Sequence, residues 1–241
     1  MVLTKALEVY GKYFKSIAAL VLPVGILVGL ILLGISNSRN EVLQLMMAFN
    51  VPGWLLSPLW IGPLIYGLSL YESGQEFGYT TTLLKGLGPW WKLLIVAVIV
   101  IAIKFITVAG SEIVPQAGFL FSLLTWVIAV FLFSRYFFIL PVLVLESRSP
   151  LENLRRCAAM SKGKRLNIIF EFVALWLLLY VVVFIMTMIL GQISNLIGGT
   201  ISTYIYFILI MGVIQPIMFA LIVVWIYYYY LEQEQEAAME A

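Results

Sequence analysis

The sequence predicts an all-α integral membrane protein with six transmembrane helices, built as three repeats of a cytoplasmic amphipathic segment and a helical hairpin. The mean hydropathy is +1.07. Only 11% of the residues are charged, less than half of the roughly 25% typical of soluble domains. A chain this apolar cannot cover its own surface, so we expect lipid to be its solvent. Residues 1–231 are expected to form one membrane domain, and residues 232–241 an acidic cytoplasmic tail.

Six apolar runs are the candidate spans, because a membrane helix needs about 20 apolar residues. The first four are residues 16–38, 58–71, 93–110 and 113–145; the fifth and sixth are the two halves of the run 172–231, divided at 191–203. The first run is too long for the apolar core of a signal peptide, which favours a retained helix. Six crossings place both termini on one side of the membrane.

The basic residues indicate which side that is. Eleven Lys and Arg residues fall in loops on the side of the termini, against Arg39 on the other side. Cytoplasmic loops carry an excess of Lys and Arg, so we expect both termini to be cytoplasmic, in a bacterial inner membrane. Six of the eleven belong to one polar segment, here called the basic island, and are interpreted as an anchor at the membrane surface: Arg148, Arg155, Arg156, Lys162, Lys164 and Arg165.

The basic island also carries a helix-start signal. Ser149 can cap a helix, Pro150 suits the first helical position, and Glu152 completes the S-x-x-E capping box. Leu151 and Leu154 would then share one apolar face, which predicts a short helix lying on the membrane surface. The N-terminus and residues 80–92 resemble this segment, and each of the three precedes two crossings. A parallel three-fold repeat is one explanation; the ordinary alternation of loops and spans is the other.

Two charges interrupt the apolar runs, Lys104 in the third and Arg135 in the fourth. Counted along straight helices, both fall near the middle of a bilayer core about 30 Å thick. Charges at that depth usually face a cavity or a partner. Together they predict an anion or lipid-phosphate site. The alternative is that they reach the interface, or pair with Glu112 and Glu171, and serve only packing.

Two further features concern helix packing and the aromatic residues. Gly25 and Gly29 form a G-x-x-x-G pair that permits close helix contact, with an internal neighbour or with a second copy of the chain. The four tyrosines 227–230 stand where an aromatic belt at the membrane interface is expected.

Composition excludes several kinds of chemistry. The chain has no His, no Asp and one Cys, so Cys and His cannot assemble a zinc or iron–sulfur site, and a Ser-His-Asp or Cys-His system is impossible. We therefore expect no cofactor and no enzymatic activity. A net charge of +2 is too small to indicate nucleic-acid binding.

One stretch resembles a known bacterial group. Its pattern is an arginine, an aromatic pair, a proline, a glutamate and a basic segment ending in Lys-Gly: Arg135, Phe137, Phe138, Pro141, Glu146, Lys162 and Gly163. This is similar to the YciC-like inner-membrane proteins and to the membrane domain beside some glycerophosphodiester phosphodiesterases. The resemblance implies the fold, an inner-membrane location and a link to envelope lipids. It supplies no catalytic residue.

Two functions fit these observations. The first is a non-enzymatic membrane protein that binds lipid, or organises a protein partner or a homo-oligomer, at the cytoplasmic face. The second is a small transporter or lipid-translocating protein that uses Lys104 and Arg135 as its site. Polar groups within the spans are sparse, which favours the first function.

Overall fold

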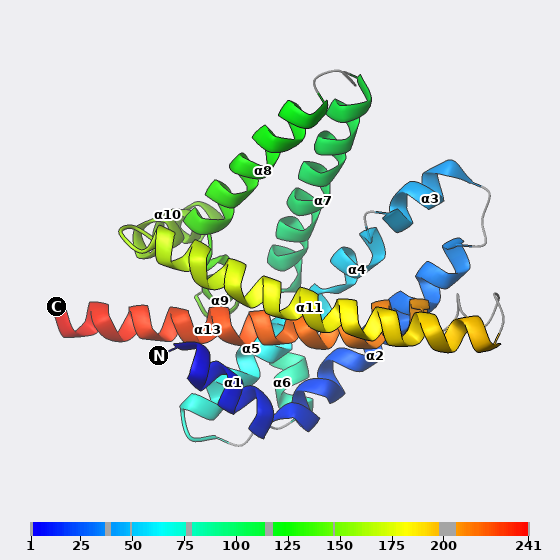
Figure 1. The fold of residues 1–241 in the computed structure, drawn as a ribbon. Coiled ribbons are helices and arrows are strands. Elements are labelled where there is room, and N and C mark those ends of the chain that lie inside the picture. The colour runs from blue at the N-terminus through cyan, green and yellow to red at the C-terminus, as the bar shows by residue number, and fades with distance from the viewer. Residues whose placement is uncertain are drawn as a thin grey trace.

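The computed structural model describes residues 2–36, 40–48, 50–75, 79–113, 118–146, 148–197 and 206–240. Every element in these ranges is a helix (Figure 1). The all-α class predicted from the sequence is therefore confirmed for the described part of the chain.

The N-terminal half starts with α1 (Val2–Lys12) and α2 (Phe14–Ser36), which are separated by a bend at Tyr13. The short helices α3 (Glu41–Ala48) and α4 (Val51–Leu56) lead to α5 (Pro58–Glu72). Proline has no amide hydrogen and is favoured in the first turn of a helix, which explains why new helices begin around Pro52 and Pro58.

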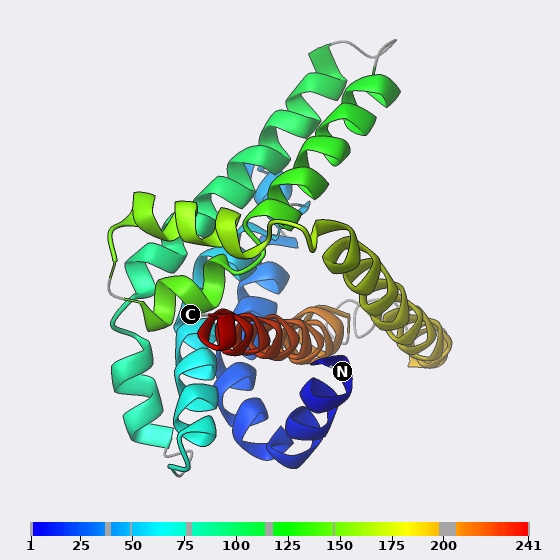
Figure 2. The ribbon, with the colours of Figure 1, turned by 90° about the vertical axis from the view of Figure 1, so that its left-hand side faces the viewer.

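The middle of the chain forms a projecting hairpin. After α6 (Tyr79–Gly86), the helices α7 (Trp90–Ile113) and α8 (Gly118–Arg135) run side by side away from the rest of the protein (Figures 1 and 2). The chain turns at Tyr136–Phe138, continues as α9 (Ile139–Leu145), and then forms α10 (Pro150–Met160). The predicted fourth span is thus interrupted directly after Arg135.

The C-terminal part consists of α11 (Arg165–Ile197), the π-helix η2 (Tyr206–Ile214) and α13 (Gln215–Glu240). Residues 232–240 continue α13 as helix. Only 11% of the apolar span 165–189 on α11 is buried by the protein, against 50% for α2. The outward side chains of α11 are therefore left for lipid or a partner to cover.

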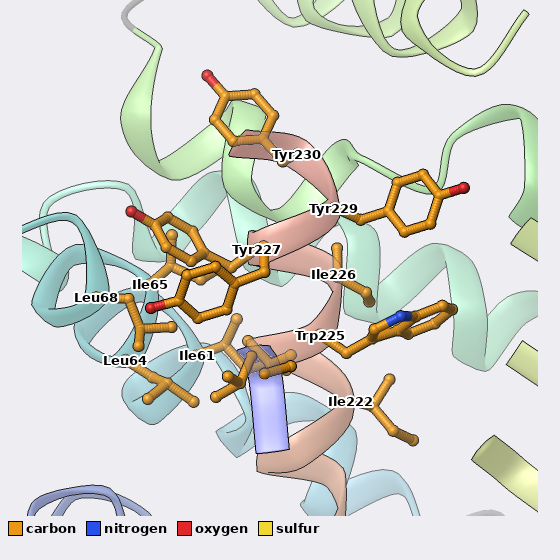
Figure 3. Packing of buried hydrophobic residues seen from close by; sticks show 14 of the residues in the cluster. Ile61, Leu64, Ile65, Leu68, Ile222, Trp225, Ile226, Tyr227, Tyr229 and Tyr230 are labelled. Carbon is orange, nitrogen blue, oxygen red and sulfur yellow. The ribbon is translucent and has the colours of Figure 1, made fainter. Parts of the chain in front are cut away.

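Helix α13 runs through the core and contacts α1, α2, α5 and α9. Figure 3 shows Ile61, Leu64 and Ile65 of α5 facing Tyr227, whereas Trp225 and Tyr229 point to the other side of α13. There the rings of Trp225 and Tyr229 lie 5.0 Å and 5.7 Å from the ring of Phe137.

This packing corrects one expectation from the sequence. The four tyrosines 227–230 are 1%, 3%, 4% and 6% exposed. A belt residue presents its ring to the headgroups, but these rings are enclosed by neighbouring helices. Their apolar bodies fill the core, and their burial depends on helices distant in sequence.

By length and composition, four described helices can cross a membrane, or five if a bent pair counts as one span. The four are Phe14–Ser36, Val127–Leu145 (the end of α8 together with α9), Arg165–Ile189 and Ile208–Met239 (η2 together with α13), and the pair is Tyr79–Gly86 with Trp90–Ile103, bent by 66°. The expected second span corresponds to α5, which has 15 residues. At ~1.5 Å per residue it is about 22 Å long, shorter than a ~30 Å bilayer core. Six crossings therefore stay a prediction.

Candidate functional site

The basic island is built around α10, whose start follows from its sequence. The Ser149 hydroxyl accepts a hydrogen bond from the Glu152 amide, and the Glu152 carboxylate accepts one from the Ser149 amide at 3.0 Å. This confirms the capping box. Asn153 and Cys157 point inward and are fully buried, whereas Leu151 is 59% exposed. Helix α10 thus packs against the rest of the protein through the buried side chains of Asn153 and Cys157, an amide and a thiol.

Half of the island's cations are neutralised within the protein. Arg156 donates through Nε to Glu146 at 2.6 Å, and its Nη2 bridges to Glu234 on α13. Lys164 pairs with Glu236, and Arg148 Nε lies 3.1 Å from Glu146 Oε2. The acidic segment 232–240 is therefore held against the island by two ion pairs.

Arg135 lies beside this island. The Ser161 hydroxyl, just after α10, donates to the Arg135 carbonyl at 2.8 Å. The Arg135 carbonyl is available for this hydrogen bond because α8 ends at Arg135. The amide four residues later, which would bond to it in a continuing helix, does not do so. Arg135 precedes Arg148 by thirteen positions in the sequence, and the packing of α10 against α9 brings Ser161, at the end of α10, back to it.

A second contact joins the start of α11 to the end of α8. The Arg165 guanidinium lies over the Phe131 ring, 5.8 Å from its centroid, one helical turn before Arg135 on α8. The Arg135 guanidinium lies 5.6 Å from the centroid of Tyr136. The Arg135 backbone is thus beside Ser161, and the Arg165 side chain is beside Phe131, so both arginines lie in the region where α8 meets the start of α11.

These two arginines differ from the paired half of the island. The Nε of Arg135 and the Nε of Arg165 are buried, and neither has a hydrogen-bond partner among the described residues. No salt bridge joins either one to a carboxylate in those ranges. Lys162 and Arg165 line a shallow depression at Gly163. We call Arg135, Lys162 and Arg165 the basic surface, because they present guanidinium and ammonium groups without a protein counter-ion in the described structure.

Two glutamates that end apolar helices meet the buried tyrosines. The Tyr228 hydroxyl donates to Glu72 at 2.7 Å, and the Tyr230 hydroxyl donates to Glu146 at 3.3 Å. Lys5 of α1 also pairs with Glu72, at 3.3 Å, and lies over the Tyr228 ring. One end of α13 therefore connects α1, the end of α5 and the end of α9.

The other predicted site residues are placed as follows. The backbone of Lys104 lies on α7, but its side chain falls outside the described part of the structure, so the paired Lys104–Arg135 site and the transporter it would serve stay predictions. Arg155 is exposed on α10. Gly25 packs against the backbone of Gly212 in η2, where a Cβ on Gly25 would come within 2.2 Å of the Gly212 carbonyl oxygen. Gly29 is buried in the same helix.

Among the described residues, no group of three or more Cys, Asp, Glu or His side chains is arranged to hold a metal ion. The sequence predicts Arg165 only as part of the surface anchor, whereas the structure places its side chain beside Phe131 of α8. The position of Arg165 in the sequence does not indicate this neighbour, because the chain reaches the start of α11 only after passing through α9 and α10.

Comparisons with protein-family models, with curated proteins and with solved structures find no match to this chain. The resemblance to the YciC-like group therefore stays a prediction.

Proposed function

We propose that this chain is a non-enzymatic, multi-pass inner-membrane protein that binds anionic lipid headgroups at its basic surface. The observation that carries the proposal is the pair of buried Nε groups on Arg135 and Arg165 without a partner in the described structure. A buried donor without an acceptor costs about 1–3 kcal/mol, and more when charged. A phosphate beside the two guanidinium groups would supply the missing counter-charge and accept hydrogen bonds from them.

The surroundings favour a lipid as the source of that phosphate. The basic surface lies at the start of α11, whose side chains Leu166 and Phe170 are 69% and 70% exposed. Leu151 and Leu154 of α10 are exposed as well, as expected for a helix lying on a membrane. Cations placed next to outward apolar side chains suit a molecule with a charged head and an apolar chain.

The ion pairs also bear on which cations reach lipid. Glu146, Glu234 and Glu236 are paired with Arg148, Arg156 and Lys164. The paired cations hold the acidic C-terminal segment, and the basic surface is left for headgroups.

The topology proposed with this function has six crossings and cytoplasmic termini. Its support is that α1 packs against α13, where Lys5 lies over the Tyr228 ring, and that Lys5 also pairs with Glu72 at the end of α5. The three-unit repeat is supported by the way Glu72 and Glu146, which close the first two units, both meet tyrosines of α13.

The test is retention of phosphatidylglycerol by the purified protein, measured by native mass spectrometry across a detergent titration. Each arginine near an anionic surface contributes about 1 kcal/mol, so Arg135→Gln and Arg165→Gln should each weaken retention about fivefold, and the double variant about 30-fold. Phosphatidylcholine retention should not change.

Arg148→Gln is the matched control, because it also removes one arginine from the island but takes away a partner of Glu146 instead. It should retain phosphatidylglycerol like the unmodified protein. If the double variant retains as much phosphatidylglycerol as Arg148→Gln, the basic surface is not a headgroup site.

A further inference from the structure

A cavity of about 150 Å³ lies between α2, the α4–α5 segment and the junction of η2 with α13. It is separate from the basic surface, since none of the residues that line it belongs to the island. A cavity of this volume accommodates a molecule about the size of benzene. Among its described lining residues none is charged, and the polar side-chain groups are those of Asn50, Ser57 and Gln215 and the indole N–H groups of Trp54 and Trp60.

Asn50 is held in the cavity wall by an unusual backbone. Its φ of 51° and ψ of 42° are left-handed, and its side chain does not cap α4. Asparagine adopts this conformation more readily than most residues, yet strained positions of this kind concentrate at functional sites. Its Oδ1 is buried without a hydrogen-bond partner in the described structure. Asn50 lines the cavity, so the cavity wall carries an acceptor that lacks a donor.

Gly53 makes this placement possible. A Cβ at Gly53 would lie 2.5 Å from Asn50 Oδ1 and 2.7 Å from its Nδ2. Any larger residue would push the amide away from its position, so the local sequence Asn-x-x-Gly holds the acceptor where it is.

A second part of the cavity wall is aromatic. Phe219 of α13 meets Trp54 edge-on at 5.9 Å and Trp60 edge-on at 5.7 Å between ring centroids. These rings form an apolar surface that suits a flat or branched hydrocarbon group.

The third wall is the junction between η2 and α13, where Gln215 and Pro216 line the cavity. Pro216 cannot donate a backbone hydrogen bond, which accounts for a change of helix type at this point. π-Helical turns frequently occur at functional sites. The close approach of Gly25 to Gly212 one turn away fixes this wall against α2.

We propose that this cavity binds a small uncharged amphipathic ligand of about benzene size, whose single hydroxyl or N–H donates to Asn50 Oδ1 while its apolar part lies against Phe219 and Trp60. An ionised ligand is disfavoured because the lining offers it no counter-charge. A purely apolar ligand is disfavoured because Asn50 would remain without a donor. The inference does not depend on lipid binding at the basic surface.

Two probes of equal size separate these cases. 4-Fluorophenol carries a donor and 4-fluorotoluene does not, and fluorine NMR can follow both in the presence of the full chain in nanodiscs, with empty nanodiscs as the background. The protein should bind 4-fluorophenol saturably and about tenfold more tightly than 4-fluorotoluene, since one buried acceptor gains a partner. Partitioning into lipid favours the toluene, so this preference cannot come from the bilayer.

Variants assign the binding to the cavity. Asn50→Gly keeps the left-handed backbone accessible and removes the acceptor. This variant should therefore bind 4-fluorophenol and 4-fluorotoluene with about equal affinity. Val24→Phe fills the cavity and should abolish saturable binding of both probes. Val98→Phe makes the same change on a half-exposed position of α7 and should bind as the unmodified protein does.

Absence of saturable 4-fluorophenol binding, or a preference unchanged in Asn50→Gly, would overturn the proposal. Equal binding by Val24→Phe and Val98→Phe would do so too. The comparison of the two probes on the unmodified protein decides the matter even where a variant does not fold.

Discussion

Replacing Arg156 by Gln should loosen the docking of α10 and expose the buried thiol of Cys157. Arg156 is the main partner of Glu146, whose side chain is 11% exposed, and it also bridges to Glu234 on α13. Arg148 cannot fully substitute, because Glu146 Oε2 makes no hydrogen bond despite its proximity. The change therefore leaves a largely buried carboxylate with a weaker partner.

The expected magnitude lies between two known limits. Exposed ion pairs contribute about 0.2–1 kcal/mol, and breaking a fully buried pair costs about 3–5 kcal/mol. The Arg156 side chain is 27% exposed, so we expect a cost of about 2 kcal/mol, which corresponds to a roughly 30-fold increase in the open population of α10.

Cys157 reports that population directly. It is the chain's one cysteine and is 0% exposed, so a maleimide reaches it only when α10 opens. Labelling rates should be measured in nanodiscs at a reagent concentration low enough for opening to stay in equilibrium. Arg156→Gln should label about 30-fold faster than the unmodified protein.

Arg155→Gln is the matched control, since it removes the neighbouring exposed cation, for which no salt bridge is present among the described residues. It should label within about twofold of the unmodified rate, as expected for an exposed charge. Equal labelling of the Arg155 and Arg156 variants, both with native helix content, would refute the view that these ion pairs hold α10.

Two further outcomes follow from the close packing of α2 and from the burial of the thiol. Gly25→Ala should lower the free energy of unfolding by about 1–3 kcal/mol in a thermal melt, because its Cβ would meet the Gly212 carbonyl at 2.2 Å. Gly34→Ala, which meets nothing within 4 Å, should be neutral or stabilising, and an equal loss in both would contradict the contact. Burial, aided by the charge of Glu146, raises the pKa of Cys157 from 9.0 to about 12. The docked thiol therefore favours folding below pH 9, and this contribution is lost as pH rises towards 12. Labelling should keep rising through pH 10, whereas a plateau near pH 9 would indicate an exposed thiol.

The helical class, the apolar spans and the start of α10 follow from the sequence alone. Span length and mean hydropathy depend on neighbours within about 20 residues, and the capping box needs only Ser149 and Glu152, three positions apart. Residues 58–71 were expected to span the membrane, and the shortness of α5, which begins at Pro58, was not expected.

The pairing of the basic island was decided by the tertiary structure. The six cations look alike in sequence, and Arg156 is separated from its partner Glu234 by 78 positions. The Arg135 backbone meets the island because the chain returns through α10, which packs against α9. No local pattern encodes such a return.

Burial of the tyrosines and the cavity at Asn50 have the same origin. A run of tyrosines looks the same in sequence whether it forms an interfacial belt or part of a core. Only the helices that pack around α13 show that these tyrosines belong to the core. Asn50 and Gly53 form a recognisable local turn, but the cavity exists because Phe219 and Gln215, more than 160 positions later in the chain, close its far side. Local patterns determine which segments are helical and apolar, whereas contacts between distant segments determine which polar groups are satisfied and which are left for a ligand.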